Sequence, residues 1–386
     1  MRKIPTDPTP GRKDLARVLR DAKALPAEWG RAFTAVPRTA FLPETFWPFA
    51  VEDGGTVKVS RADDPISWFR YASTNIQLVT EWSAGLKARE LAKCLSPKPS
   101  DLFPLLGDLE VTSGVRVLEI GTGTAWPTAL LAFRVRSENI VSMQPEYNVA
   151  QQALRTLAEY GDPVKVAIGD GLQGYPKGGP YDRIISTAAV HEVPISWVQQ
   201  SNPGSLIAAP WGTPYSQGRA VARLTVARDG ASAAGPFTRA VEAPLNRAHR
   251  LMYPEPAWRV SVPAASTTST DVRADDLLGQ EQNSLERFVL GLRVSHCTHA
   301  VSQQPDGGRV LWLYGRTDRS WACVHFREEG PAKVWQSGHR QLWAETHLAY
   351  RWWVDQGRPG YERLGLTVDA RGQRAWLDDP ANSWAL

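Results

Sequence analysis

Val117-Leu-Glu-Ile-Gly-Thr-Gly-Thr-Ala-Trp126 is the stretch that decides the fold. Apolar residues lead directly into Gly121 and Gly123, and a helical stretch follows, so the pattern predicts a strand, a tight turn and a helix. Glycine lets the backbone turn sharply and approach a ligand, and the free amides at the helix start can bind a carboxylate or ribose oxygens. The spacing differs from the Gly-x-Gly-x-x-Gly of dinucleotide enzymes, and alone it also fits an ordinary strand-to-helix turn.

From residue 115 onward, short apolar runs alternate with helical stretches. The predicted strands are 115–120, 140–143, 164–168, 183–186 and 205–209, and the helices between them are 127–135, 147–160 and 195–200. Alternating strands and helices indicate a parallel sheet that is covered on both faces. The predicted fold class is therefore α/β, with a Rossmann-like sheet closed by an antiparallel hairpin within 221–242.

Two further regions flank this core. The predicted division is an N-terminal lobe with a pre-core substrate segment at 1–110, the core at 111–247 and a C-terminal α+β extension at 248–386. The elements expected outside the core are a helix over 15–24, an extended segment over 36–43, and helices over 76–94 and 276–292. Eight of the 16 tryptophans lie between Trp312 and Trp384, which fits either an aromatic core or an aromatic surface that grips a peptide.

The composition limits the class of protein. The 386 residues carry a net charge of +4, which gives little support to a nucleic-acid partner. The three cysteines, Cys94, Cys297 and Cys323, are far apart and odd in number, as is typical of a reducing compartment and not of a disulfide scaffold. The N-terminus lacks the apolar run of a signal peptide, and no stretch approaches about 18 consecutive apolar residues. We therefore expect a cytoplasmic protein without a membrane partner.

Polar residues also follow the second and third predicted strands. The second ends at Gln144-Pro145-Glu146, where an amide or a carboxylate can accept hydrogen bonds from ribose hydroxyls. The third ends at Gly169-Asp170-Gly171, where a carboxylate between glycines can reach an adenine amine and leave room for the ring. Each pattern alone also fits a plain strand end or an Asp-Gly turn. Together they place three loops at the carboxyl ends of consecutive strands, where open parallel sheets bind ligands.

Further motifs surround these loops in a fixed order. They are Val36-Pro-Arg-Thr-Ala-Phe-Leu-Pro43, Ser73-Thr-Asn-Ile-Gln-Leu-Val79, Gly169-Asp-Gly-Leu-Gln-Gly-Tyr-Pro176, Tyr181-Asp-Arg-Ile-Ile-Ser-Thr-Ala-Ala189 and Glu192-Val-Pro194. With the glycine loop, this set resembles the protein-L-isoaspartate O-methyltransferase family over roughly residues 30 to 247. The resemblance implies a carboxyl O-methyltransferase that uses S-adenosyl-L-methionine as its cofactor.

The resemblance also implies a role for individual residues. Thr74, with Ser73 beside it, carries the hydroxyl that lies next to the transferable methyl group, and both are expected to be catalytic. The implied cofactor-binding residues are Glu119, Gly121, Thr122, Gly123, Gln144, Pro145, Asp170, Gly171 and Leu172. The implied substrate-binding residues are Asn75, Trp126 at the rim of the cofactor pocket, and His191, which also fits a surface loop histidine. The chain departs from the family pattern at Ile76, which replaces a proline, and at Gln144, which replaces an acid. Ala125-Trp126 after the glycine loop and His191, where the family often has a small residue or a proline, are further departures.

The chemistry asks little of the protein. A carboxylate is already ionised at neutral pH, so positioning and exclusion of water supply the acceleration, and no general base is expected. The stretch His296-Cys-Thr-His299 spaces two histidines as a metal clip does, but no second cluster follows and structural zinc needs four ligands, so we expect no metal.

The end of the chain suggests a subgroup. Tyr361-Glu-Arg-Leu-Gly-Leu-Thr-Val-Asp-Ala-Arg-Gly-Gln-Arg-Ala-Trp-Leu-Asp-Asp-Pro380 is similar to family members associated with graspetides, ribosomal peptides that ATP-grasp ligases crosslink. The similarity implies methylation of an aspartyl side chain in a modified precursor peptide, aspartimide formation and a functional link to an ATP-grasp ligase. The alternatives are an L-isoaspartyl protein repair methyltransferase with an added domain, and a non-catalytic peptide-binding protein on a degenerate core.

Overall fold

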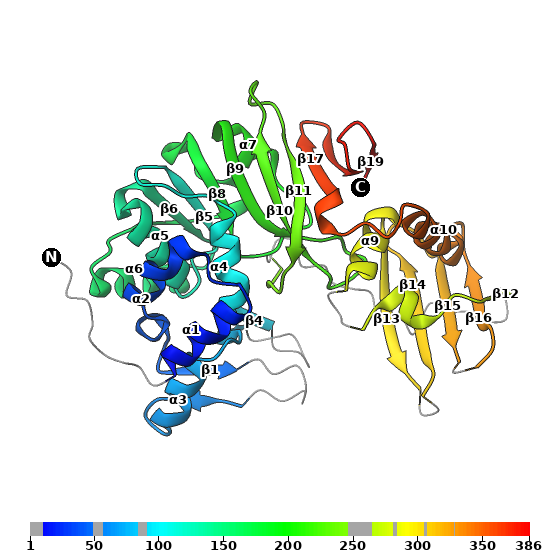
Figure 1. Ribbon diagram of the computed structural model, residues 1–386, viewed down its shortest axis with the longest axis horizontal. Coiled ribbons are helices and arrows are strands. Elements are labelled where there is room, and N and C mark those ends of the chain that lie inside the picture. The colour runs from blue at the N-terminus through cyan, green and yellow to red at the C-terminus, as the bar shows by residue number, and fades with distance from the viewer. Residues whose placement is uncertain are drawn as a thin grey trace. The chain divides into compact units, whose positions relative to one another are not determined.

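A computed structural model describes residues 11–48, 57–83, 91–245, 265–280, 284–304, 307–327 and 329–386 (Figure 1). The chain divides into two compact units. The first holds residues 1–188, 194–209 and 223–233, and the second holds 189–193, 210–222 and 234–386. Because the strands β9 (Ser201–Trp211) and β10 (Ala220–Val226) have residues in both units, the units interleave along the chain. The three-region division expected from the sequence stays a prediction.

The first unit contains the predicted parallel sheet. Its strands are β5 (Val117–Ile120), β6 (Ile140–Gln144), β7 (Lys165–Ile168), β8 (Tyr181–Ser186) and β9, in the order β9-β8-β5-β6-β7. All pairs among them are parallel. Because β5 pairs with β6 on one side and with β8 on the other, the chain changes direction across the sheet at β5, and such switch points bind ligands. The α/β, Rossmann-like fold class is confirmed.

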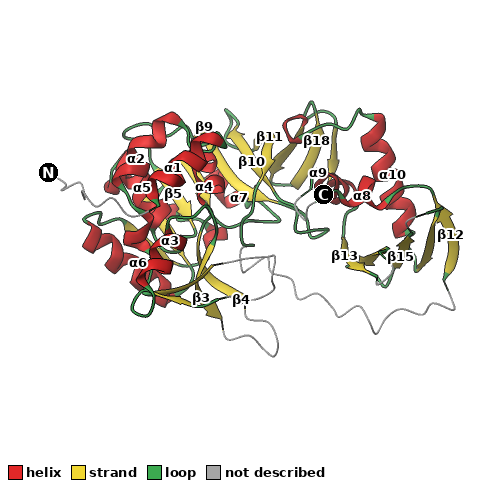
Figure 2. Ribbon diagram, turned by 60° about the horizontal axis from the view of Figure 1, so that its bottom comes forward, coloured by secondary structure: helices red, strands yellow, loops and turns green. Residues whose placement is uncertain are grey.

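Helices accompany this sheet, as Figure 2 shows. They are α4 (Pro99–Gly107), α5 (Trp126–Val135), α6 (Tyr147–Tyr160) and α7 (Ile195–Gln199). α5 buries residues on nearly all sides because its sequence is almost wholly apolar, whereas α6 buries only the stripe that carries Val149, Ala150, Ala153 and Leu157. The helix α5 therefore begins inside the core, and its first turn is held by packing on every side.

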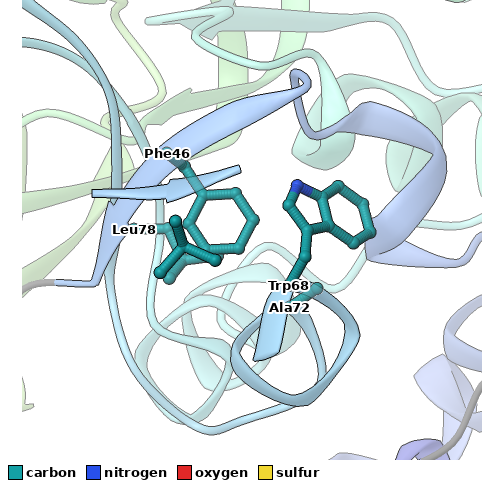
Figure 3. Packing of buried hydrophobic residues seen from close by; sticks show 5 residues of the cluster. Phe46, Trp68, Ala72 and Leu78 are labelled. Carbon is teal, nitrogen blue, oxygen red and sulfur yellow. The ribbon is translucent and has the colours of Figure 1, made fainter. Parts of the chain in front are cut away.

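The N-terminal part of the first unit has an antiparallel sheet of its own. It begins with the helices α1 (Arg12–Asp21) and α2 (Gly30–Ala35), and its strands β1 (Thr45–Pro48), β2 (Val59–Ser60), β3 (Leu78–Ser83) and β4 (Leu91–Ser96) have the order β2-β1-β3-β4. The helix α3 (Pro65–Ala72) adds Trp68 and Ala72 to a buried cluster with Phe46 and Leu78, in which the rings of Phe46 and Trp68 lie 5.5 Å apart (Figure 3).

Two sequence predictions for this part were wrong. The helix expected over 76–94 is replaced by β3 and β4, in which Leu78 pairs with Ser96 and Val79 with Leu95. Valine, threonine and tryptophan favour a pleated strand, and the cross-strand pairs override a helical spacing that the short run also fits. The segment expected to be extended over 36–43 instead makes a 3₁₀ turn at Arg38–Phe41 after Pro37.

The second unit contains a five-stranded antiparallel sheet with the order β12-β16-β15-β14-β13. Its strands are β12 (Ser266–Thr270), β13 (Cys297–Gln303), β14 (Arg309–Gly315), β15 (Trp321–Phe326) and β16 (Ala332–Ser337). Trp312 and Trp335 each pair with Cys323, so both project from the same face, and Trp312 stacks on Tyr314 with their rings 6.0 Å apart. Trp343 and Trp353 are buried, as in an aromatic core, whereas Trp312 and Trp335 are partly exposed. Peptide binding by the exposed rings stays a prediction.

Helices and a hairpin complete the second unit. The helix predicted over 276–292 is two helices, α8 (Ala274–Leu278) and α9 (Leu285–Arg293), because Gly279 ends α8 with a φ of +59°. The helix α10 (Leu342–Asp355) follows, and β11 (Ala233–Ala240) neighbours β17 (Leu364–Asp369), β18 (Gly372–Leu377) and β19 (Ser383–Ala385) in the order β19-β18-β17-β11. The stretch 361–380 is thus a hairpin, and Arg363 donates two 2.7 Å bonds to Asp378 across its base. In the described part of the chain, no helix is long and apolar enough to cross a bilayer.

Candidate active site

The loop after β5 is shaped for the close approach of a ligand. Gly121 has a φ of +97° and Gly123 a φ of +52°, a region that favours glycine. A Cβ on Gly121 would lie 2.6 Å from Thr187 Oγ1, and one on Gly123 would lie 3.1 Å from the carbonyl oxygen of Leu95 on β4. The amides of Gly121 and Thr122 both donate to the carbonyl of Met143, at 2.9 and 3.2 Å. The loop is therefore fixed to the end of β6 and has no room for side chains at either glycine.

Glu119 lies beneath this loop and not on its surface, since its exposed fraction is 0%. Its Oε2 accepts hydrogen bonds from Thr128 Oγ1 on α5 at 2.5 Å and from Ser142 Oγ on β6 at 2.6 Å, and Ser142 Oγ lies 2.6 Å from Thr122 Oγ1. Oε1 is buried and has no hydrogen-bond partner among the described residues. Burial raises the pKa of the carboxyl to about 7, although the two donating hydroxyls act in the opposite direction. Glu119 thus braces β5, β6, α5 and the glycine loop from below.

The second and third strand ends meet this loop. The amide of Gly169 donates to the carbonyl of Gln144 at 3.2 Å, and a Cβ on Gly171 would lie 2.5 Å from Ile120 Cγ2. Asp170 is exposed, and its Oδ1 accepts from the amide of Leu172 at 3.0 Å, which fixes the direction of the carboxylate. The structure therefore brings together the predicted residues of all three strand ends, including the buried Gln144 and the exposed Pro145.

Glu146, the possible substitute for the missing acid, lies beside a lysine. Its Oε2 is 3.8 Å from Lys93 Nζ on β4, and the same ammonium donates to Glu81 Oε1 on β3 at 2.5 Å. The Lys93 charge partly neutralises Glu146, so Glu146 does not simply replace a free acid next to Gln144.

The pre-core segment, which is the motif over residues 73–79, follows α3 directly. Ser73 caps the end of that helix, and its exposed fraction is 9%. Thr74 is exposed, and its hydroxyl donates to the carbonyl of Arg70 at 2.8 Å. Asn75 Oδ1 accepts from the amide of Ser100 at 2.9 Å in the first turn of α4, so this side chain, expected to bind substrate, acts as a helix cap. Of the three, Thr74 is therefore the residue whose side chain is open to an incoming molecule.

Trp126, expected at the rim of the pocket, lies in the core with an exposed fraction of 1%. Its Nε1 donates to the carbonyl of Val36 at 3.1 Å, and its ring meets Phe103 edge-on with centroids 5.8 Å apart. A tryptophan in the fully buried first turn of a helix has no exposed face to offer. Its contribution to the site is support of the loop that precedes it.

Arg38 is a site residue that the sequence analysis missed. It is almost fully buried, and its guanidinium lies 5.5 Å from the centre of the Trp126 ring. It donates to Ser96 Oγ and to the carbonyls of Thr74, Ile76, Ser96 and Pro97, at 2.9 to 3.3 Å. Burial lowers its pKa to about 9, which still leaves the group charged at neutral pH. Its hydrogen-bond partners are 36 to 59 positions away along the chain, so no local sequence pattern could predict these contacts.

His191 and the histidine pair lie in the second unit. His191 Nδ1 is 2.5 Å from the carbonyl oxygen of Gly212, and the His191 carbonyl accepts from Gln373 Nε2 at 3.0 Å; its role toward a substrate stays a prediction. His299 Nδ1 is 2.7 Å from the carbonyl oxygen of Tyr215, and burial lowers the pKa of His299 to about 4. Over the described ranges, no group of three or more His, Cys, Asp or Glu side chains is placed to hold a metal ion.

Comparison with known proteins points to one family. A family model described as protein-L-isoaspartate(D-aspartate) O-methyltransferase matches residues 100–233. The protein-L-isoaspartate O-methyltransferase of Hyperthermus butylicus is 30% identical over 244 residues, which cover 61% of this chain and 87% of the relative. That of Methanoculleus marisnigri is 42% identical over 105 residues, so the match spans about half of that relative, 47% of its length.

A solved protein-L-isoaspartate O-methyltransferase shares the fold. Its TM-score is 0.52, and the alignment covers 95% of this chain and 100% of the solved chain at 19% identity. Together with the glycine loop, the three strand ends and the pre-core segment, these matches show that the chain belongs to the protein-L-isoaspartate O-methyltransferase family, a family of S-adenosylmethionine-dependent carboxyl methyltransferases.

Proposed function

We propose that this protein transfers a methyl group from S-adenosylmethionine to an aspartyl-type carboxylate in a peptide. One observation carries the proposal: the hydroxyl-bearing pre-core segment and the glycine loop are both fixed against the end of β4. Gly123 lies against the Leu95 carbonyl, and Arg38 joins Ser96 to the carbonyl of Thr74. In this arrangement a methyl acceptor and a nucleotide-type cofactor would lie on either side of one strand end.

The residues present fit the cofactor. The glycine loop is a cradle that a Cβ would fill, and Glu119 Oε1 is a buried acceptor without a partner among the described residues. Residues 121–123 would hold the methionine part, Gln144 and Pro145 the ribose, and residues 170–172 the adenine. When bound, S-adenosylmethionine supplies an electrophilic methyl group on a positively charged sulfur.

The chain's own contribution is positioning. A substrate carboxylate is ionised at neutral pH, so no residue has to remove a proton from it. Thr74 is exposed and can turn its hydroxyl from the Arg70 carbonyl to the substrate carboxylate, which it would orient by donating a hydrogen bond. Ser73, at the end of α3, fixes the backbone from which Thr74 projects. Orientation of this kind supplies a large part of a two-reactant acceleration.

Replacing Thr74 by valine is expected to lower kcat by about tenfold to a hundredfold, because valine keeps the shape and removes the hydroxyl. The free energy of unfolding should change by less than about 1 kcal/mol, since the lost bond to Arg70 is exposed. Thr34→Val is the matched control, because Thr34 is also exposed and its hydroxyl also donates to a carbonyl four residues earlier, that of Gly30 at 3.0 Å. Equal kcat values for the two variants would remove Thr74 from the catalytic machinery.

The first candidate substrate is an aspartyl side chain in a crosslinked ribosomal peptide. The similarity of 361–380 to graspetide-associated enzymes supports it, as does the aromatic face with Trp312, Tyr314 and Trp335. The aspartyl methyl ester would then react further: the amide nitrogen of the next residue attacks the ester carbonyl, methanol leaves, and an aspartimide ring closes. A modified precursor peptide would be the partner, and an ATP-grasp ligase would supply its crosslinks.

The second candidate is an isoaspartyl residue in a damaged protein. The relatives named for this activity favour it. The solved relative is also aligned with 95% of this chain, so the region after the core is not by itself a mark of a different substrate.

One paired assay separates the two substrates. The protein is incubated with S-adenosylmethionine and either a crosslinked precursor peptide or a simple isoaspartyl peptide, and products are followed by mass. A gain of one methyl group and then a loss of methanol on the crosslinked peptide alone supports the first candidate. Methylation of the isoaspartyl peptide alone supports the second, and no methyl transfer to either contradicts the proposed function.

A further inference from the structure

Arg38 is a buried charge surrounded by neutral oxygens. Every acceptor that the described residues offer its guanidinium is a carbonyl or a hydroxyl, and none is a carboxylate. A buried charge without a counter-ion costs free energy unless several strong hydrogen bonds compensate. Five such bonds are present, and they converge from the segment after α3 and from the end of β4 in the first unit.

The acceptors belong to the segments that form the proposed site. The carbonyls of Thr74 and Ile76 bracket Asn75 in the pre-core segment, whereas Ser96 ends β4 and Pro97 follows it. The same strand end lies against Gly123, since the Leu95 carbonyl would be 3.1 Å from a Cβ there. On its other side, the guanidinium lies over Trp126, the first residue of the helix after the glycine loop. Arg38 thus stands between the segment that carries Thr74 and the loop that would carry the cofactor.

Another arginine of the same unit shows the same chemistry without this location. Arg134 donates to the carbonyls of Glu28 and Val111 at 2.9 and 3.0 Å, and it lies 5.4 Å from the centre of the Trp29 ring. None of its partners belongs to the strand ends or to the pre-core segment. Arg134 therefore shows how an arginine that binds carbonyls can stabilise the fold away from the site. The contacts of Arg38 differ from those of Arg134 because they join the two sides of the site.

We propose that Arg38 is a positioning residue, which holds the Ser73–Ile76 segment at a fixed place relative to the glycine loop and so sets where the acceptor carboxylate lies. This role rests on the proposed function. Alanine or lysine at position 38 cannot reproduce a planar fork of donors that reaches both the Thr74 segment and the end of β4. Loss of the fork frees the Thr74 segment but leaves the glycines and the third strand end in place.

The test compares Arg38→Ala, Arg38→Lys and the matched control Arg134→Ala. For Arg38→Ala we expect kcat/KM for the peptide acceptor to fall by about a hundredfold, the effect of a misplacement of about 1 Å, while the Kd for S-adenosylmethionine stays within about threefold. Arg38→Lys should recover little of the loss, and millimolar guanidinium chloride should restore part of it where sodium chloride does not. Arg134→Ala should lower Tm, leave kcat/KM for the peptide acceptor unchanged and show no response to guanidinium.

The outcomes are distinct. Acceptor kinetics in folded Arg38→Ala that match those of Arg134→Ala would overturn the positioning role, and so would equal losses of acceptor kinetics and cofactor affinity. If Arg38→Ala does not fold, Ser96→Ala removes only the Oγ acceptor at 2.9 Å, and an unchanged kcat/KM for the peptide acceptor in that variant overturns the role. Wild-type protein that methylates no carboxylate refutes the proposed function itself, whereas an active wild type with unaffected Arg38 variants refutes only the positioning role.

Discussion

Replacing Gly121 by alanine is expected to weaken S-adenosylmethionine binding by about tenfold to a hundredfold and to destabilise the fold by about 2 kcal/mol. Gly121 has a φ of +97°, and its Cβ would lie 2.6 Å from Thr187 Oγ1, which donates to the Gly121 carbonyl at 2.7 Å. The methyl group would therefore displace Thr187. It would also shift the amides of Gly121 and Thr122, which donate hydrogen bonds to the Met143 carbonyl. Calorimetric titration gives the Kd, and urea unfolding gives the stability.

Gly114 provides a matched control for this variant. It has a φ of +89°, and nothing lies within 4 Å of the Cβ that an alanine would add. Gly114→Ala thus imposes a similar backbone strain, of about 1 kcal/mol, in open space before β5. Cofactor affinity should be unchanged in Gly114→Ala. Equal affinities for the Gly121 and Gly114 variants would show that the loop is not the cofactor cradle.

Glu119 is expected to make the stability of the protein fall as the pH rises. Burial raises its pKa from an ordinary 4.5 to about 7. A carboxyl with a raised pKa contributes stability that is fully present below about pH 4.5 and is lost as the pH rises through 7. The shift corresponds to roughly 3 kcal/mol. Glu119→Gln lacks the titration, so between pH 5 and pH 8 the wild type should lose roughly 3 kcal/mol relative to this variant.

The measurement is urea unfolding of both proteins across that pH range, with Glu159→Gln as control. Glu159 is exposed on α6, so its replacement should leave the pH dependence of the wild type intact. If the free energies of unfolding of wild type and Glu119→Gln depend on pH in the same way, the Glu119 carboxyl titrates outside this range. Glu119 would then support the glycine loop as an ionised carboxylate.

The parts of the structure that could be predicted are those with local signals. An apolar run followed by Gly121-Thr-Gly123 specifies a strand, a turn and a helix within a few residues, and the same holds for the strands before Gln144 and Asp170. Their meeting at one edge then follows from the parallel order of the sheet, since consecutive parallel strands end on the same side.

The parts that could not be predicted depend on distant partners. Residues 78–83 and 91–96 carry a spacing that also fits a helix, and only pairing such as that of Val79 with Leu95 decides for strands. From the sequence, Arg38 is indistinguishable from an ordinary surface arginine. Its role depends on four carbonyls that are distant along the chain and surround it only in the folded protein. Trp126 comes directly after the glycine motif, where a rim residue is expected, but the largely apolar helix α5 packs it into the core.

The cap that Asn75 makes on Ser100 has a consequence for engineering. Asn75 lies inside the Ser73–Ile76 segment and also caps the first turn of α4, so the segment and this turn cannot be exchanged separately. A chimera that receives a new acceptor segment from a relative should therefore take the first turn of α4 from the same donor, together with the residue at position 38. A chimera that takes these parts from different donors would lose the hydrogen bond from the Ser100 amide to Asn75, and the first turn of α4 would fray.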